Sequence, residues 1–447
     1  MQTRRDHVQA YRFATGRLAS ALLTGDIRTG DSPMHRARLG SVFGIALAAL
    51  LVAGFAVYGL LKPQPRDWRD SGPFVAEKES GTRYLYTDGV LHPVLNYTSA
   101  LLALGEPARP HQVPRSALKG VPRGTVLGVA GAPDAIPSAG DLLTGAWSRC
   151  LHPGRPGDLV IDFQPAAHAA APVPAGAHVL VVDPHGTLYV VLRDTRYRVP
   201  DRAALVALGL DSHTPVPAPA DWLADLPTGP ALTPATVPGS GSPGPRVAGR
   251  PAHTGDVLRT GVAGSVHFYV LRGDGVAPVT ATEAALLSAG HGRPREVTPD
   301  DVAALPESAD RSLLTRLPDV VRTRDAGTGA GALCLRQRMR GGTPESVLVT
   351  EGGSAAAAGS GILLPAGSGI LATPPARGEY PTRQLYLITD QGRRYPLADD
   401  RAATALGYVT AVARTLPRAL LESIPAGPAL GITGVTGGQQ RIAGEQR

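Results

Sequence analysis

The sequence predicts an α+β protein, in which a single N-terminal transmembrane helix is followed by four small α/β repeats arranged in two halves. Three observations support this fold class. The stretch Leu39–Leu61 is apolar over 23 residues. After it, one pattern of apolar strand, turn, proline and helix occurs four times. The 447 residues also include 54 Gly and 42 Pro, which is typical of many short elements and turns rather than of long helical bundles.

The transmembrane helix is predicted at residues 39–61, which contain no charge and no proline. A helix of this length runs to about 35 Å, enough to cross a hydrocarbon core of ~30 Å. The alternative is a cleavable signal peptide, whose apolar core has about 7–15 residues before a small-residue cleavage site. Here the apolar run is longer and leads into Lys-Pro-Gln-Pro-Arg-Asp-Trp. We therefore expect a retained anchor followed by a linker over residues 62–80.

The tail before the anchor, residues 1–38, is basic and predicts an amphipathic helix, because several of its apolar residues recur at helical spacing. Such a helix can lie on anionic lipid or dock against a partner. The alternative is a solvated basic tail that only fixes the topology. The candidate docking residues are Arg5, Tyr11, Arg12, Leu18 and Leu22.

Orientation follows from the tail and from the cysteines. The tail carries seven arginines, and long domains translocate largely regardless of charge. Cys150 and Cys334 are the two cysteines, and both follow the anchor. An even count in an exported region favours one disulfide, although two unpaired buried thiols are the alternative. We expect a single-pass protein of the cell membrane, with a cytoplasmic N-terminus and an extracytoplasmic body.

The four repeated segments begin at Arg83, Leu188, His267 and Leu385. Each strand is expected to reverse at an Asp or Asp/Gly turn, since glycine supplies the positive φ of such turns. These turns are Asp88-Gly89, Asp194, Asp274-Gly275 and Asp390-x-Gly392. The helices are expected to end at the C-capping glycines Gly105, Gly209, Gly290 and Gly407. Segments two and four also share the motif PxGPAL, at 227–232 and 425–430.

Extra length falls after the first repeat and before the fourth, and it holds the two cysteines. This spacing predicts two halves that each add one insertion to a shared central domain, joined by Cys150–Cys334. The segment Thr233–Gly255 is rich in Pro, Gly and Ser and is expected to be a flexible surface connection, and Glu351–Gly361 a loose loop. The expected boundaries are 1–38 for the tail, 39–61 for the transmembrane helix, 62–80 for a linker, 81–130 for repeat 1, 131–187 for the first segment of the central domain, 188–235 for repeat 2, 236–255 for the Pro/Gly linker, 256–310 for repeat 3, 311–384 for the second segment of the central domain, 385–430 for repeat 4 and 431–447 for a disordered end.

The sequence contains no recognisable active site. The formal net charge of +7 comes from dispersed arginines without a nucleic-acid signature, so no nucleic-acid partner is expected. No lysine completes GxxxxGK[ST], and neither GxSxG nor HExxH occurs. The histidines lack metal-ligand spacing. We expect no catalytic, cofactor or metal site and no enzymatic activity, and we interpret Trp147 as packing on the disulfide.

Several stretches resemble the EccB family, a single-span component of the actinobacterial ESX (type VII) secretion system. They are residues 4–26, the span, residues 77–105 and the Trp147/Cys150 pair. The resemblance covers essentially the whole chain and implies an elongated extracytoplasmic region, in which four α/β repeat domains surround a disulfide-stabilised central β domain. In this chain the third repeat departs most, since Ser-Ala-Gly replaces Ala-Leu-Gly.

The resemblance also implies a function. The partners would be the FtsK/SpoIIIE-like motor ATPase EccC, EccD, EccE and other copies of EccB. We therefore expect a non-catalytic structural component of the secretion complex, whose extracytoplasmic region assembles over the pore. The alternatives are a peptidoglycan-binding module and an ATPase, as some family members are described. The sequence offers no phosphate-binding lysine or backbone nest for the last of these.

Overall fold

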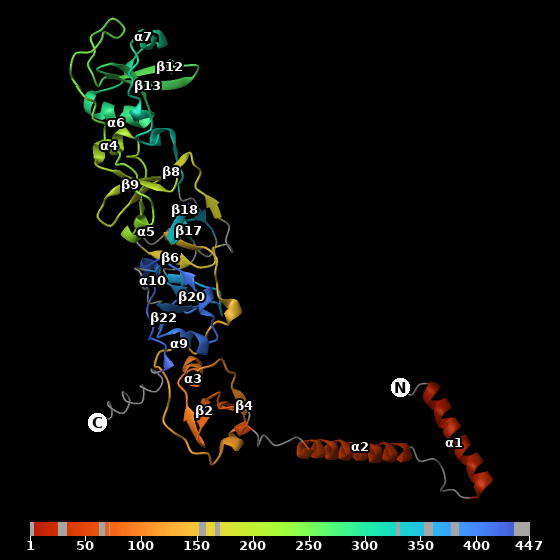
Figure 1. The fold of residues 1–447 in the computed structure, drawn as a ribbon. Coiled ribbons are helices and arrows are strands. Elements are labelled where there is room, and N and C mark those ends of the chain that lie inside the picture. Colours follow the sequence, from red (N-terminus) through yellow and green to blue (C-terminus); the bar gives the residue numbers. More distant parts are fainter. Residues whose placement is uncertain are drawn as a thin grey trace. The chain divides into compact units, whose positions relative to one another are not determined.

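The computed structural model describes residues 4–25, 34–61, 68–70, 72–151, 158–165, 170–327, 331–352, 361–376 and 384–432. The chain divides into two units, Met1–Gly72 with Val113–Lys119, and Pro73–Gln112 with Gly120–Arg447 (Figure 1). Most of the expected loose loop at 351–361 and of the expected disordered end at 431–447 lies outside the described residues.

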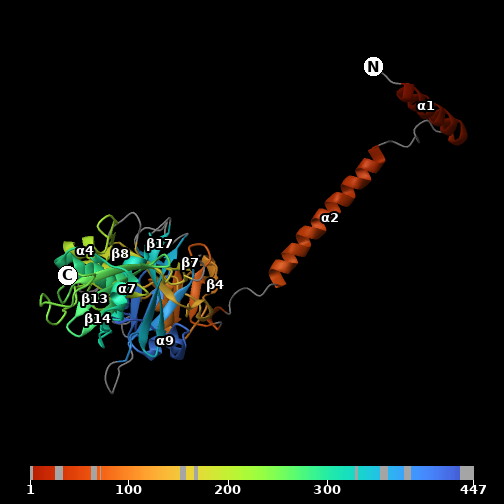
Figure 2. The same cartoon turned by 90° about the horizontal axis from the view of Figure 1, so that it is seen from above.

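The first unit contains two long helices, α1 (Arg4–Thr24) and α2 (Met34–Leu61). Figure 2 draws α2 as one continuous helix. Among the described residues, one helical segment, Arg38–Tyr58, is long and apolar enough to cross a membrane, and none of its apolar window is buried. The predicted single apolar helix near the N-terminus is confirmed.

The second unit contains four small sheets with one common strand order, β3-β2-β1-β4, β10-β9-β8-β11, β14-β13-β12-β15 and β22-β21-β20-β23. In each, three antiparallel strands precede a short outer strand, which is parallel to its neighbour in the last three sheets. This arrangement confirms the predicted α+β class of small repeated sheets.

The elements of the first two repeats are β1 (Phe74–Glu77), β2 (Arg83–Thr87), β3 (Val90–Pro93), α3 (Tyr97–Leu104) and β4 (His111–Val113), then β8 (Ala177–Val182), β9 (Leu188–Leu192), β10 (Thr195–Val199), α4 (Arg202–Ala207), β11 (Val216–Pro217) and α5 (Ala220–Ala224). Those of the last two are β12 (Val257–Val262), β13 (Ser265–Arg272), β14 (Gly275–Val279), α6 (Ala281–His291), β15 (Arg295–Glu296) and α7 (Pro299–Ala303), then β20 (Gly369–Thr373), β21 (Leu385–Thr389), β22 (Arg394–Leu397), α9 (Asp400–Ala405), β23 (Arg414–Thr415) and α10 (Arg418–Ser423). Strands β1, β8 and β20 lie before the predicted boundaries at 81, 188 and 385. The prediction missed these strands because they carry no repeated motif.

The predicted turns join the second and third strands of each sheet. Asp88 and Gly89 have φ of 51° and 77°, and Arg193 and Asp194 have φ of 50° and 58°. Positive φ at both central residues is the geometry of a tight hairpin whose twist matches its strands. The proline that follows each turn therefore lies in or next to the returning strand rather than directly before the helix.

Each repeat helix begins at a residue whose side chain accepts a hydrogen bond from the third helical N–H. These N-caps are Asn96, Asp201, Thr280 and Asp399. A cap of this kind satisfies one of the free N–H groups of the first turn. At the other end, Gly105, Gly209 and Gly407 have positive φ as expected. The prediction for Gly290 is wrong, because α6 continues through it and ends before Gly292 (φ 91°).

The PxG motif is a structural feature of all four repeats, although the sequence revealed it in two. One residue of the returning strand donates its N–H to a proline carbonyl, and its own carbonyl accepts from the N–H two positions after that proline. The strand residue, the proline and the second donor are Leu91, Pro122 and Gly124 in the first repeat, Arg196, Pro227 and Gly229 in the second, Val276, Pro306 and Ser308 in the third, and Arg394, Pro425 and Gly427 in the fourth.

The glycine of this motif permits a close approach to the hairpin. An ideal Cβ on Gly427 would lie 2.3 Å from the Tyr395 ring, and one on Gly229 would lie 2.2 Å from the Tyr197 ring. In the third repeat the motif has Ser308, and the close contact falls on Gly275, whose ideal Cβ would lie 2.2 Å from the Pro306 carbonyl oxygen. This exchange explains why the third repeat lacks the sequence motif.

A six-stranded sheet forms the central domain, with the order β19-β6-β5-β17-β18-β7. Its strands are β5 (Trp147–Leu151), β6 (Leu159–Asp162), β7 (Ala170–Pro172), β17 (Ala332–Arg340), β18 (Thr343–Glu351) and β19 (Gly361–Leu363). Exchanging the two halves, so that β5, β6 and β7 replace β17, β18 and β19, returns the same order. Each outermost strand therefore pairs with the other half, but β19–β6 is parallel and β18–β7 is antiparallel.

The repeats pack in pairs through their helices, α3 against α9 and α4 against α6. One core cluster joins residues of the first and fourth repeats, including Leu101 and Ala403, and another joins Leu208 of the second repeat to Leu286 of the third. Exchanging the halves turns the first pairing into the second. The packing thus follows the same approximate two-fold relation as the central sheet.

The expected flexible connection at Thr233–Gly255 instead packs on the third repeat. Val237 lies in a core cluster with Val270, and Val247 lies in another with Leu258. The backbone of Gly244 donates to Ala252, and that of Gly255 donates to Leu271. Pro and Gly here shape compact turns with apolar anchors, so composition alone was a poor guide to flexibility.

Candidate functional site

The candidate docking residues all lie on α1, at positions on successive turns of the helix. At about 100° per residue, Val8, Tyr11, Leu18 and Leu22 fall within an arc of about 80°. Tyr11, Leu18 and Leu22 are 72%, 64% and 82% exposed. This apolar stripe has no cover within the described chain, and the basic Arg5 and Arg12 flank it. The sequence did not single out Phe13, which is 61% exposed on another side.

The disulfide joins Cys150 on β5 to Cys334 on β17, across 184 positions of the sequence. Both residues are fully buried and are direct cross-strand partners. The predicted pairing is therefore confirmed, and the alternative of two free thiols is excluded. The bond joins the two innermost strands of the central sheet, one from each half of the sequence.

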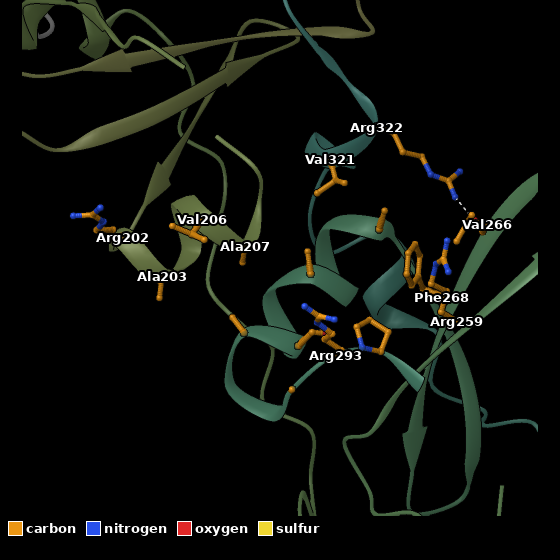
Figure 3. A pocket seen from close by; sticks show the side chains of 16 residues that line it. Arg202, Ala203, Val206, Ala207, Arg259, Val266, Phe268, Arg293, Val321 and Arg322 are labelled. Atoms are coloured by element: carbon orange, nitrogen blue, oxygen red, sulfur yellow. Dashed lines mark hydrogen bonds between the residues drawn. The ribbon is translucent and has the colours of Figure 1, made fainter. Parts of the chain in front are cut away.

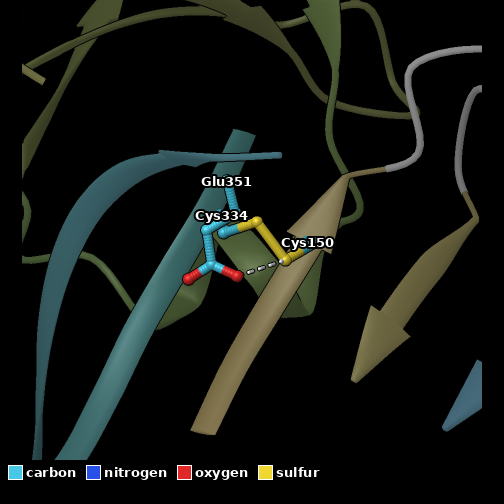
Figure 4. Close-up of side chains that lie close together, drawn as sticks. All are labelled: Cys150, Cys334 and Glu351. Atoms are coloured by element: carbon cyan, nitrogen blue, oxygen red, sulfur yellow. Dashed lines mark hydrogen bonds between the residues drawn. A yellow bond between two sulfur atoms is a disulfide. The ribbon is translucent and has the colours of Figure 1, made fainter. Parts of the chain in front are cut away.

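A buried glutamate lies beside the disulfide (Figure 4). Oε2 of Glu351 lies 3.8 Å from Sγ of Cys150. The other oxygen accepts from Ser148 Oγ at 2.7 Å and from Arg336 Nη2 at 2.9 Å. Cys150, Cys334 and Glu351 bring three possible metal-ligand atoms within 4.8 Å of one another. A disulfide holds no thiolate to bind a metal, so these contacts favour a structural role.

Trp147 does not pack on the disulfide as predicted. It is three residues from Cys150, and side chains at odd spacing point to opposite faces of a strand. Its Nε1–H donates to Gln337 Oε1 at 2.8 Å, and it packs in a core cluster with Ile370 of the fourth repeat. The Arg414 guanidinium stacks 4.9 Å from the Trp147 ring, and burial lowers the pKa of Arg414 to about 10.

Arg149 ties the central sheet to the second repeat. Its side chain is 3% exposed and forms ion pairs with Asp221 and Asp225, on α5 and directly after it. Trp222, on the same helix, donates from Nε1 to the Arg149 carbonyl at 2.9 Å. The sequence did not reveal this buried charge, because its partners are about seventy residues away.

A groove lies between α4 and α6, next to β13 (Figure 3). Its volume is about 1220 Å³. Alanines, valines and Phe268 form most of its lining, and Figure 3 shows Val206 and Val321 on opposite sides of it. Its polar lining includes Arg202, Arg259, Arg293 and Arg322 and no acidic residue.

The profile of the family described as "Type VII secretion system ESX-1, transport TM domain B" matches residues 1–436. The chain belongs to the EccB family. EccB3 of Mycolicibacterium smegmatis is 28% identical, covering 95% of this chain and 89% of that protein. EccB1 of Mycobacterium tuberculosis H37Rv is 29% identical, covering 91% and 88%.

Two solved structures have the same fold. The structure described as an intact ESX-5 inner membrane complex aligns with a TM-score of 0.60 at 23% identity, covering 97% of this chain and 95% of that one. The EccB3 dimer from the ESX-3 core complex aligns with a TM-score of 0.55 at 27% identity, covering 81% and 99%. This EccB chain is thus a structural component of a type VII secretion membrane complex, with one candidate membrane span among its described residues.

The prediction that the chain is not an enzyme is contradicted by the names of its relatives. EccB3 and EccB1 are both named secretion system ATPases. The prediction depended on the absence of a GxxxxGK[ST] loop. Such a loop is one of several ways in which a protein can bind phosphate. A phosphate site assembled by the fold from distant residues leaves no such motif in the sequence.

Proposed function

We propose that this EccB chain anchors an extracytoplasmic body to the secretion complex, with α1 in the cytoplasm and the disulfide-bonded repeats outside. The observation that carries this orientation is the buried Cys150–Cys334 bond, which follows the span in the sequence. Disulfides form and persist in oxidising compartments and are rare in the cytosol. The arginine-rich tail agrees, since positive charge favours retention inside.

Single-cysteine labelling tests the orientation. Gln9→Cys on α1 and Lys78→Cys between β1 and β2 each place a thiol at an exposed position. A membrane-impermeant maleimide should label Lys78→Cys on intact spheroplasts, and Gln9→Cys only after detergent permeabilisation. Wild type, whose cysteines are both in the disulfide, is the unlabelled control. Labelling of Gln9→Cys alone on intact spheroplasts would reverse the assignment.

We also propose that the apolar stripe of α1 docks on other subunits of the complex, which would be the EccC-like motor ATPase, EccD and EccE. The support is an apolar stripe that has no cover within the described chain. Arg12→Ala/Leu18→Ala should reduce co-purification with these subunits, and with it secretion, by about tenfold. The matched control is Gln9→Ala/Ser20→Ala, outside the stripe. Full co-purification of the first double variant would rule out docking through the stripe.

The extracytoplasmic body is proposed to pack against other copies and to assemble over the pore. The dimer of the related EccB3 supports this. Gel filtration with multi-angle light scattering of the purified chain in neutral detergent should show a protein mass of twice the monomer at micromolar concentration. A monomer alone at that concentration would contradict self-association.

ATP hydrolysis is a second candidate function, supported by the names of the relatives. The test is phosphate release by the purified full chain with Mg²⁺ and ATP. Activity should remain proportional to the EccB peak across a final gel-filtration step. Release at buffer background would remove this candidate and leave the structural role untouched.

A further inference from the structure

The groove between α4 and α6 combines an apolar floor with a cationic rim. Val206 on α4 is 51% exposed and Val321 after α7 is 41% exposed, so large apolar side chains face the open groove from both sides (Figure 3). Between these two valines the groove is lined by alanines of α4 and α6, whose small side chains leave space for a ligand. Exposed apolar residues gathered in one concave surface are typical of a binding site rather than of a free surface.

The charged residues that line this groove are all arginines. Of the four lining arginines, Arg259 pairs with Glu296, and Arg322 pairs with Asp319 and donates to the Val266 carbonyl. Arg202 and Arg293 are exposed and form no ion pair with any residue in the described part of the chain. No aspartate or glutamate lines the groove. Two guanidinium groups are therefore available for carboxylates of a ligand.

We propose that this groove binds an acidic amphipathic segment of another protein. Apolar side chains of the segment would cover Val206, Phe268 and Val321, and its Asp or Glu residues would pair with Arg202 and Arg293. The charge complementarity selects an acidic partner. The apolar floor selects a peptide over a polyanion, because a polyanion would leave the valines and Phe268 in contact with water.

Peptide binding to the purified full chain in a neutral maltoside detergent tests the proposal. The probe is a fluorescein-labelled helical peptide with leucine on one face and glutamate beside it. The comparison peptide has lysine at every glutamate position. Fluorescence polarisation should show binding of the glutamate peptide alone, weakening as salt rises because the arginine–carboxylate pairs are exposed.

Two groove variants and one control locate the binding site. Arg202→Glu/Arg293→Glu and Val206→Asp should each weaken binding by about tenfold. The control, Arg338→Glu/Arg340→Glu, reverses two exposed arginines of β17 that do not line the groove and should leave binding unchanged. Melting temperatures check that all variants are folded. Equal affinity of wild type and both groove variants, or an equal loss in the control, would overturn the proposal.

The other occupants give distinct results. Flotation with phosphatidylglycerol vesicles that depends on Arg202 and Arg293, without peptide binding, would show a lipid site and contradict a protein partner. Self-association lost in Arg202→Glu/Arg293→Glu, without peptide binding, would show that a second copy fills the groove and also contradict the proposal. Neither result depends on the membrane orientation proposed above.

Discussion

The Cα atoms of Cys150 and Cys334 lie 4.0 Å apart, because the two residues are direct partners on neighbouring antiparallel strands. Their bond links two strands that belong to different halves of the sequence. It therefore fixes the register between β5 and β17, the innermost of the strand pairs that join the two halves of the central sheet.

Removing this bond should destabilise the body. Cys150→Ala/Cys334→Ala opens a loop of 184 positions, and the chain-entropy argument gives a loss of up to about 5 kcal/mol in the free energy of unfolding. Urea unfolding followed by tryptophan fluorescence measures the change. Reductant should lower the wild-type midpoint and leave that of the variant unchanged. Equal midpoints for the two proteins without reductant would contradict a stabilising role.

Gly427 should not tolerate a methyl group. An added Cβ would lie 2.3 Å from the ring of Tyr395, which is 1% exposed and cannot move aside freely. Gly427→Ala should lower the free energy of unfolding by about 1–3 kcal/mol through overpacking. Gly145→Ala, where no atom lies within 4 Å of the added Cβ, is the matched control. Tyr395→Leu should restore part of the loss in the double variant, since the two sites are coupled; a purely additive result would contradict the steric explanation.

Arg149 should be needed for the contact between the central sheet and the second repeat. Arg149→Met removes the guanidinium and leaves Asp225, whose side chain is 18% exposed, without its partner. Breaking a buried pair in this way costs about 3 kcal/mol. Arg338→Met, in the exposed pair with Glu345, should cost below about 1 kcal/mol. Thermal unfolding of both variants measures the difference, and equal losses would show that burial of Arg149 adds nothing.

His178 should make stability depend on pH near neutrality. Burial lowers the pKa of His178 below its ordinary value of 6.5, against the raising effect of Asp325, while the nearby His213 lowers it further. Nδ1 of His178 also lies 2.8 Å from the Thr323 hydroxyl. The unfolded chain therefore binds a proton at this residue at a higher pH than the folded chain does. The free energy of unfolding is therefore unaffected by protonation of His178 above about pH 7. It decreases as the pH falls through 6.5 toward the pKa of His178 in the folded chain.

The measurement for His178 is the urea midpoint between about pH 7.5 and about pH 5.5, the range that spans this loss. His178→Gln should flatten the fall in midpoint, while His185→Gln, at an exposed turn, should keep it. An unchanged slope in His178→Gln would assign the pH dependence to other groups.

Much of the fold was predictable because the repeats leave local signals. Asp88-Gly89 and the C-capping glycines mark a hairpin and a helix end within a few residues, and the apolar stretch at 39–61 needs no tertiary context. The disulfide followed from cysteine count and position. These features are determined by neighbours in the sequence or by simple counting.

The remainder depends on contacts between distant residues. The Arg149 pairs, the contact of Trp147 with Gln337, and the groove formed by Val206 and Val321 each join segments that only the folded chain brings together. The segment at 233–255 was misjudged for the same reason, since Val247 becomes an anchor only when Leu258 is beside it. The PxG turn of the third repeat was not recognised in the sequence, because this repeat has Ser308 at the glycine position of the motif and has the closely packed glycine at Gly275 instead.

The exchanged outer strands have a consequence for biogenesis. Strand β6 can pair with its outer neighbour β19 only after Gly361–Leu363 has been synthesised, and β7 can pair only after β18 has been synthesised. Until then the first half has unpaired strand edges, which are prone to aggregation. If the body is threaded across the bilayer from its N-terminal side, those edges stay uncovered until β18 and β19 have followed. The Cys150–Cys334 bond, which joins β5 to β17, can likewise close only after the second half of the body has followed the first.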